Sequence, residues 1–369
     1  MKKELIAGIF IAVLLSIAPC AFSQIQMVST TGGQLQGVVV DGVASFKGIP
    51  FAAPPVGNLR WKAPEPVKKW TGIRKADSYA AGCMQDPAMS KMMGTAANVS
   101  EDCLYLNVWT GAKKAGEKRP VMVWIHGGAF VGGMTGTPMF DGTKFAQEGV
   151  VLVSIAYRLG VFGFLAHPEL SRESGKGSGT YGIQDMIAAL QWVKDNIAQF
   201  GGDPSCVTIF GESAGGIAVG MLAAAPQAKG LFQRAISESG GSFAPPRIAN
   251  EAGQNVPTLK LAEANGEAFL KRLGAADIKA ARALSAEQIQ KAVGSGMGGG
   301  GFWPVADGNI LPGDPYELYQ KGRFNDTPIL LGTNSNEGGL FMRGPVTAAV
   351  FEKQIRSGYG ERADIILNA

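Results

Sequence analysis

A single serine lies in the middle of the segment V-T-I-F-G-E-S-A-G-G, residues 207–216. The apolar run from Val207 to Phe210 predicts a β-strand, and the small residues from Gly216 to Ala225 are compatible with a helix. The intervening G-x-S-x-G is typical of a tight strand-to-helix turn that exposes the serine hydroxyl above a sheet edge. Glycine and serine are also common in ordinary turns. The strand before and the helix after favour Ser213 as a nucleophile.

A second glycine-rich segment, H-G-G-A-F at residues 126–130, follows the apolar run Pro120–Ile125. Glycines leave backbone N–H groups unobstructed, and a developing oxyanion needs such donors. An ordinary turn after a strand would look the same. Because the serine turn lies downstream, we expect this loop to act together with the N–H of Ala214, the residue after the nucleophile.

A nucleophilic serine also needs a carboxylate and a base, which are expected after it in the chain. Glu337 follows the apolar run Pro328–Leu331, between Asn336 and Gly338, as a loop carboxylate would. Asp307 and Asp326 are rivals. Asp307 precedes Gly308-Asn309 and Asp326 precedes Thr327-Pro328, so both are more typical of turns.

The general base that should deprotonate the serine is not evident in the sequence. The chain contains two histidines, His126 and His167, and both precede Ser213. We expect the ring of His126 to brace the glycine-rich loop, and His167 stands before Pro168 in a Phe/Gly-rich segment. No histidine follows Glu337, so the sequence supplies no evident general base.

The surrounding sequence predicts an α/β fold in one domain, because buried-type strands alternate with an amphipathic helix. Residues 24–51 predict hairpin strands, residues 53–70 a Pro/Trp-rich surface loop, and 245–301 a helical excursion with a capping box at Ser285. Asp203-Pro204 predicts a turn into the serine strand. The expected strands are Leu104–Trp109, Pro120–Ile125, Val150–Ala156, Val207–Phe210, Ala235–Ser237 and a buried Pro328–Leu331; the expected helices include Tyr181–Phe200 and Leu259–Leu273.

Composition narrows the class of protein. The 369 residues are 46% apolar and 17% charged, enough for a large core, and a net charge of +4 without basic clusters argues against nucleic acid as a partner. Lys2 and Lys3 before the apolar run Leu5–Ala18 predict a signal peptide over 1–23, cleaved after about Ser23. We therefore expect a secreted or periplasmic domain, 24–369, without a membrane span. The sequence leaves the oligomeric state open.

Seven segments together resemble the type-B carboxylesterase/cholinesterase family of α/β-hydrolases, from about Val39 to about Phe341. Two of them, around the serine and around E-D-C-L, match family signatures nearly throughout and occur in the family's order. The segments are F-K-G-I-P-F-A-A-P-P-V-G-N-L-R-W (46–61), E-D-C-L-Y-L-N-V-W (101–109), W-I-H-G-G-A-F (124–130), Y-R-L-G-V-F-G-F-L (157–165), F-G-G-D-P-S-C-V-T-I-F-G-E-S-A-G-G (200–216), F-W-P-V-A-D-G (302–308) and T-N-S-N-E-G (333–338).

The resemblance implies a role for each matching position. It makes Ser213 the acyl-accepting nucleophile and Glu337 the triad acid. It makes Gly128, Ala129 and Ala214 the oxyanion donors, with Gly127 shaping the loop. Glu212 aligns with a carboxylate near the active-site water of cholinesterases, and Cys83–Cys103 with the family's first disulfide. No metal or organic cofactor is implied.

The family is longer than this chain, and its catalytic histidine and last strands lie beyond the position of Ala369. The resemblance therefore implies a C-terminally truncated member. Cys206, inside the serine strand, is expected to be a buried free thiol. Residues 84–102 contain no Trp, Tyr or Phe, so this loop offers no seat for a quaternary ammonium group.

These observations predict an exported serine carboxylesterase that hydrolyses small carboxylic esters through an acyl-serine. The alternative is a non-catalytic binding or adhesion member of the same fold, which the missing histidine keeps open. A lipase acting at membranes is disfavoured, because the excursion 245–301 is charged and glycine-rich rather than apolar.

Overall fold

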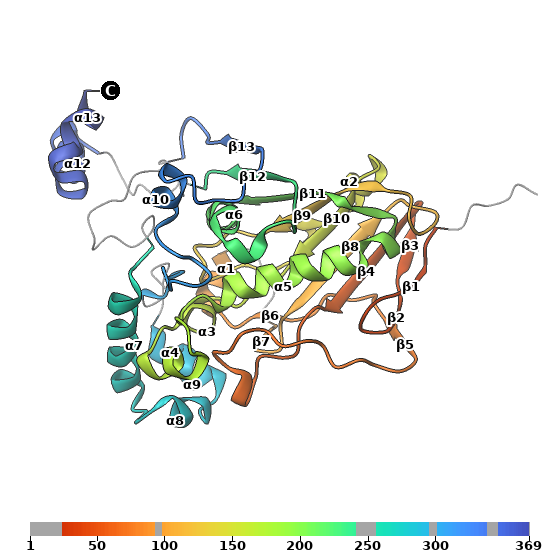
Figure 1. Ribbon diagram of the computed structural model, residues 1–369, viewed down its shortest axis with the longest axis horizontal. Helices are drawn as coiled ribbons and strands as arrows, with labels where there is room; N and C mark the ends of the chain where they lie inside the picture. The colour runs from red at the N-terminus through yellow and green to blue at the C-terminus, as the bar shows by residue number, and fades with distance from the viewer. Residues whose placement is uncertain (1–23, 93–97, 241–255, 295–300, 338–345, 369) are drawn as a thin grey trace, which may run out of the picture.

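An eight-stranded mixed sheet forms the centre of the computed structural model, which describes residues 24–92, 98–240, 256–294, 301–337 and 346–368 (Figure 1). Five neighbouring strands are parallel, and three antiparallel strands extend the sheet beyond them. In spatial order the strands are β13 (Ile329–Gly332), β12 (Arg234–Glu238), β11 (Gly202–Glu212), β9 (Arg119–Ile125), β10 (Val151–Ile155), β8 (Tyr105–Thr110), β4 (Val43–Pro50) and β3 (Val38–Val40).

Helices cover both faces of this sheet, which explains the apolar strands. All five residues of β10 are buried, as the unalternated sequence predicts. On β9, Val121 and Val123 enter the larger core with helix α5 (Tyr181–Asn196), whereas Met122 packs against the smaller core under helix α2 (Thr143–Gln147). The two helix layers therefore enclose the strands that end at the serine and the glycine-rich loop.

The remaining helices lie around and beyond this sandwich. The helix α6 (Ala214–Ala224) begins directly after Ser213 and packs on β11 and β12. The others are α1 (Pro87–Met92), α3 (Gly160–Phe164), α4 (Pro168–Ser174), α7 (Leu259–Leu273), α8 (Ile278–Arg282), α9 (Ala286–Val293), α10 (Pro315–Gln320), α12 (Ala348–Tyr359) and α13 (Ala363–Leu367).

The predicted helical excursion is present as α7, α8 and α9, which lie together beside the sheet in Figure 1. Its boundaries at Leu259 and Leu273 agree with the sequence prediction, and α9 begins with the expected capping box at Ser285. The buried Arg60 guanidinium holds the excursion in place. It pairs with Glu101 at 2.6 Å and donates to the carbonyl of Leu284 at 2.9 Å.

Two small sheets complete the fold at its N-terminal side. One contains β1 (Met27–Ser29), β2 (Gln34–Gln36) and β5 (Ile73–Lys75), and the other pairs β6 (Gly82–Cys83) with β7 (Val99–Ser100). Cys83 of β6 forms a disulfide with Cys103, which follows β7 in the chain, in agreement with the resemblance. The predicted hairpins over residues 24–51 are present.

Three expectations need correction. The strand β13 is exposed rather than buried, with Leu330 and Leu331 at 65% and 52% exposure, because no described strand pairs with its outer side. The turn at Asp203 forms within β11, which already begins at Gly202; Asp203 accepts from the Ser205 N–H while the strand register shifts there. Cys206 is a free thiol, but it is only partly buried, next to the exposed Arg234 side chain.

Some expectations fall on residues outside the described ranges, namely the signal peptide at 1–23 and the parts of the helical excursion at 245–255 and 295–300. Among the described helices, none is long and apolar enough to cross a membrane. The helices α12 and α13 lie apart from the sheet in Figure 1 and expose Phe351 and Ile365 at 49% and 73%.

Candidate active site

Ser213 occupies the sharp turn between β11 and α6. Its backbone has φ 55° and ψ −122°, a conformation that L-residues adopt only when the surroundings impose it. The Ser213 N–H donates to the carbonyl of Glu238 at the end of β12, at 2.9 Å. This contact fixes the turn against the neighbouring parallel strand.

The two glycines of G-x-S-x-G are required by space. A Cβ on Gly215 would lie 2.0 Å from the carbonyl oxygen of Ile125, and a Cβ on Gly211 would lie 2.6 Å from the Gly215 carbonyl carbon. Both approaches are with backbone atoms, which cannot move aside as a flexible side chain can. The motif that the sequence offers is therefore the one this turn demands.

The glycine-rich loop after β9 lies directly against the serine. A Cβ on Gly127 would be 3.2 Å from Ser213 Cβ and 2.6 Å from the Glu212 carbonyl oxygen. The chain then runs through three successive left-handed residues, Gly128, Ala129 and Phe130, with φ of 105°, 54° and 57°. Such a run gives the peptide groups of the loop an orientation unlike that of a strand or helix.

Aromatic packing holds the loop in this conformation. Phe130 is fully buried, with its ring edge-on to Trp303 at 4.9 Å and to Phe164 at 5.4 Å. Its carbonyl accepts from the Gly160 N–H at 2.7 Å. Such packing offsets the cost of the left-handed backbone.

His126 also stabilises the glycine-rich loop. Its ring stacks on Tyr157 at 4.4 Å, its Nδ1 lies 2.8 Å from the Gly127 carbonyl oxygen, and the Tyr157 hydroxyl donates to the His126 carbonyl at 2.8 Å. Burial lowers the pKa of His126 to about 4. The ring is therefore neutral near pH 7 and is engaged in supporting the loop.

His167 has a different structural task. It is the N-cap of α4, where its ring Nδ1 accepts from the Glu169 N–H at 3.2 Å. The backbone N–H of His167 donates to Ser178 Oγ at 3.1 Å. Burial lowers its pKa as well. No contact joins either histidine to the Ser213 side chain in the described part of the chain.

Glu337 is brought to the end of β12 by Ser239. The Ser239 hydroxyl donates to Glu337 Oε1, and the Asn334 N–H donates to the same oxygen at 2.7 Å. These two donors, the Ser239 hydroxyl first, lower the pKa of Glu337 and keep it a carboxylate. Because Ser239 directly follows Glu238, the strand end that contacts the Ser213 backbone also holds Glu337.

Sequence reasoning did not identify Ser239. A signal was available, since Ser239 follows the strand expected at Ala235–Ser237, and the carboxyl ends of parallel strands meet at one sheet edge. Its φ of 53° and the bond from its N–H to the Gly332 carbonyl, 2.7 Å, became visible only in three dimensions.

Glu212 adds a second carboxylate next to Ser213. Partial burial raises its pKa, and the negative charges of Glu337 and Glu238 raise it further. The edge of the sheet thus gathers three carboxylates. The rival acids are not placed there by any contact: Asp307 accepts from the Leu311 N–H at 2.9 Å in a buried turn, and Asp326 is exposed.

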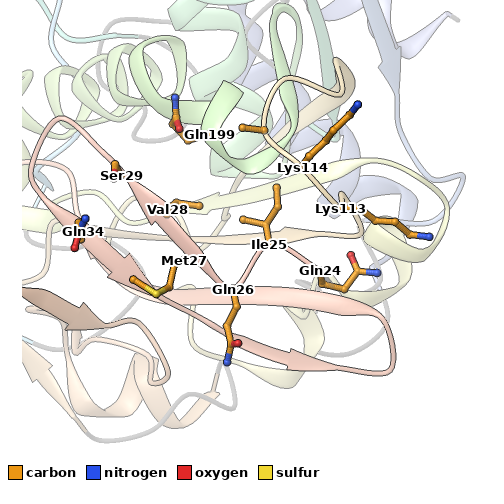
Figure 2. Close-up of a pocket in the computed structure, with 11 residues that line it drawn as sticks. Gln24, Ile25, Gln26, Met27, Val28, Ser29, Gln34, Lys113, Lys114 and Gln199 are labelled. Carbon is orange, nitrogen blue, oxygen red and sulfur yellow. The ribbon is translucent and has the colours of Figure 1, made fainter. Parts of the chain in front are cut away.

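A shallow groove of about 500 Å³ lies elsewhere, between β1, β2 and the turn at residues 113–115 (Figure 2). Glutamine and lysine side chains edge it, and none of its lining residues belongs to the serine turn, the glycine-rich loop or the Glu337 segment. No group of three or more His, Cys, Asp or Glu side chains among the described residues is placed so that it could hold a metal ion. The candidate active site therefore does not lie in this groove. It consists of Ser213, residues 126–130 and Glu337.

The fold and this arrangement define a member of the carboxylesterase family. The model of that family matches residues 24–366, so the chain belongs to it, with the α/β-hydrolase fold. The chain is 41% identical over 350 residues to the fumonisin B1 esterase of Sphingopyxis macrogoltabida, covering 91% of this chain and 61% of that protein. It is 40% identical over 327 residues to the para-nitrobenzyl esterase of Bacillus subtilis strain 168, covering 86% and 64%.

Solved structures agree. A thermophilic para-nitrobenzyl esterase superimposes with a TM-score of 0.79 at 36% identity, covering 93% of this chain and 71% of that one. A carboxylesterase of Geobacillus stearothermophilus gives a TM-score of 0.76 at 38% identity, covering 90% and 69%. The chain therefore spans somewhat less than two thirds of the two curated relatives' length.

Proposed function

We propose that this chain carries the acyl-transfer centre of a serine carboxylesterase. One observation supports this above the others: the left-handed serine turn and the glycine-rich loop are built against each other, with Gly127 directly beside Ser213. A nucleophile and a set of backbone donors at one point is the arrangement that acyl transfer requires.

The reaction would proceed in two steps. The Ser213 hydroxyl attacks the ester carbonyl carbon and gives its proton to a base, and the N–H groups of Gly128, Ala129 and Ala214 receive the oxyanion. Collapse breaks the bond to the alcohol oxygen, which takes the proton as it leaves. Water then attacks the acyl-serine by the same route, releasing the acid and restoring the hydroxyl.

The base in this scheme is an imidazole oriented by Glu337. His126 and His167 are both committed to structural contacts, so neither of them supplies this imidazole. Without that imidazole, Ser213 remains a weak nucleophile, and the site retains roughly 10³–10⁴-fold acceleration over water.

The substrates would be small uncharged carboxylic esters. The names of the relatives, a fumonisin B1 esterase and a para-nitrobenzyl esterase, are consistent with esters of varied shape. A choline ester is disfavoured, because residues 84–102 contain no aromatic side chain. We also propose that the protein is exported. The test is whether Gln24 is the first residue of the secreted protein.

A rescue experiment tests the activity. The 369-residue chain and its Ser213→Ala variant would be assayed on a short-chain aryl acetate with increasing imidazole, subtracting the rate of imidazole alone. We expect added imidazole to raise the rate of the parent by more than tenfold and to leave Ser213→Ala at background. Equal rates in the two proteins would exclude Ser213 as the nucleophile.

The two committed histidines favour one alternative, a non-catalytic binding member of the same fold. A fluorophosphonate probe separates the two readings, because it forms a covalent bond only with an activated serine. Mass spectrometry that finds Ser213 unlabelled with and without imidazole would support the binding protein and contradict the esterase.

A further inference from the structure

A buried glutamine joins the disulfide segment to the glycine-rich turn. Gln85 is 2% exposed, and its carboxamide is fully engaged. Its Nε2 donates to the carbonyl of Cys83 at 3.0 Å and to the carbonyl of Gly133 at 2.9 Å, while its Oε1 accepts from the Gly133 N–H at 3.0 Å. One side chain thus binds both polar groups of a single residue 48 positions away.

Gly133 lies immediately behind the start of the glycine-rich loop. A Cβ on Gly133 would be 2.3 Å from His126 Nδ1 and 2.8 Å from the Gly127 carbonyl oxygen, and its φ is 119°. One residue earlier, the Gly132 carbonyl oxygen lies where a Cβ of Gly128 would be, at 2.2 Å. The pair Gly132–Gly133 is therefore a second backbone layer in contact with the loop.

The other end of the glutamine is firmly anchored. Cys83, two residues before Gln85, is joined to Cys103, and Gly82 pairs with Val99 in β6 and β7. A Cβ on Gly82 would meet the Met134 side chain at 2.8 Å, so this segment also packs on the residue after Gly133. The Gln85 carboxamide therefore attaches Gly133 to a segment that is itself held in place.

We propose that Gln85 is a positioning residue for the oxyanion hole: it fixes Gly133, and through Gly132 and Gly133 it fixes the orientation of the peptide groups at Gly127 and Gly128. This inference rests on the proposed function of that loop. Donors to an oxyanion act only when they are held in place beforehand, and loss of one donor costs about 10²–10³ in rate. Loosening the layer behind them should cost about tenfold, and the cost should fall on the chemical step.

The test compares two glutamine variants of the full chain. Gln85→Met keeps the volume and removes all three hydrogen bonds. Gln233→Met is the matched control, since Gln233 accepts from the backbone N–H of Val207 at 2.8 Å in the middle of β11, the strand that ends at the serine. Both should lower the melting temperature, but only Gln85→Met should lower kcat of the imidazole-assisted reaction, by about tenfold with KM nearly unchanged.

Hydrogen exchange provides a readout that does not need turnover. Backbone amides of residues 127–133 should exchange at least tenfold faster in Gln85→Met than in the parent, and at the parental rate in Gln233→Met. If Gln85→Met does not fold, Gln85→Asn replaces it, because the shorter side chain cannot span Cys83 and Gly133 together. An unchanged exchange rate, or a kcat loss equal in both variants, would overturn the inference.

The two proposals fail separately. A parent chain without Ser213-dependent turnover contradicts the esterase, and the exchange of residues 127–133 still decides whether Gln85 orders the loop. A parent chain with turnover that Gln85→Met leaves intact contradicts the positioning role alone.

Discussion

Ser239 links the two halves of the candidate site. Its N–H donates to Gly332, its hydroxyl donates to Glu337, and the preceding Glu238 carbonyl receives the Ser213 N–H. The carboxylate is thereby held relative to the serine through a strand end. A glutamate in a loop is usually solvated. Glu337 is instead held by two hydrogen-bond donors, which stabilise its charged form.

His126 should make folding dependent on pH. Its folded-state pKa is about 4, against about 6.5 when exposed, so the unfolded chain binds the proton more readily. Stability from this group is fully present above pH 6.5 and is lost as the pH falls from 6.5 to 4. The loss should be roughly 3 kcal/mol, following 1.36 kcal/mol per pKa unit.

Urea denaturation at pH 7 and at pH 4.5 measures this effect. The His126→Asn variant cannot titrate and should lose less stability between the two pH values than the parent does. His167→Asn is the companion variant, because the pKa of His167 is also lowered by burial. A parent whose urea midpoint is flat across this range would contradict a neutral, buried His126.

At the scale of elements, the strand β11, its turn and α6 depend on the close approach of Gly215 to β9. Gly215→Ala would place a methyl group 2.0 Å from the Ile125 carbonyl oxygen, so the helix must move away from the strand. We expect a loss of about 3 kcal/mol of stability and loss of the serine geometry.

Gly332→Ala is the control for this variant, because a Cβ there meets nothing within 4 Å and its φ is not in the left-handed region. Thermal unfolding of both variants and imidazole-assisted turnover are the measurements. A Gly215→Ala protein as stable as Gly332→Ala would show that the turn is not as tightly packed as the structure has it.

Periodicity and turn chemistry predicted most elements. Helix α7 agrees with its prediction at both ends, and the apolar content of β10 reports its burial on two faces. The same reasoning fails at β13, because an apolar run states what could be buried and not whether a neighbour covers it. Ser239 and Gln85 were missed for a related reason. Their roles arise from contacts over 98 and 48 positions, which no local pattern encodes.

At the scale of the whole molecule, β13 leaves one side of the sheet uncovered by the described residues. Leu330 and Leu331 point to opposite faces and are both more than half exposed. A bare apolar edge strand is a template for pairing with another strand. We expect the 369-residue chain to self-associate at micromolar concentration.

A charge on the edge should suppress this association. Leu331→Lys keeps the backbone pairing with β12 and adds a charge of the kind that protects natural edge strands. Sedimentation velocity of the parent and of Leu331→Lys over a concentration series is the measurement. Leu261→Lys is the matched control, because Leu261 is also an exposed leucine but lies on helix α7. A parent that stays monomeric throughout would contradict the expectation.

The left-handed residues around the serine affect which substitutions can accumulate in this protein during evolution. Seven non-glycine residues of the described chain have positive φ, and four of them, Ala129, Phe130, Ser213 and Ser239, lie at the candidate site. Each costs about 1 kcal/mol or more that glycine would not. At Ala129 and Ser213, mutation to glycine would relieve this cost in a lineage without need of the site, whereas at Phe130 the lost core packing would outweigh the relief. The persistence of Ala129 and Ser213 in a set of natural sequences would therefore record continuing selection for the site.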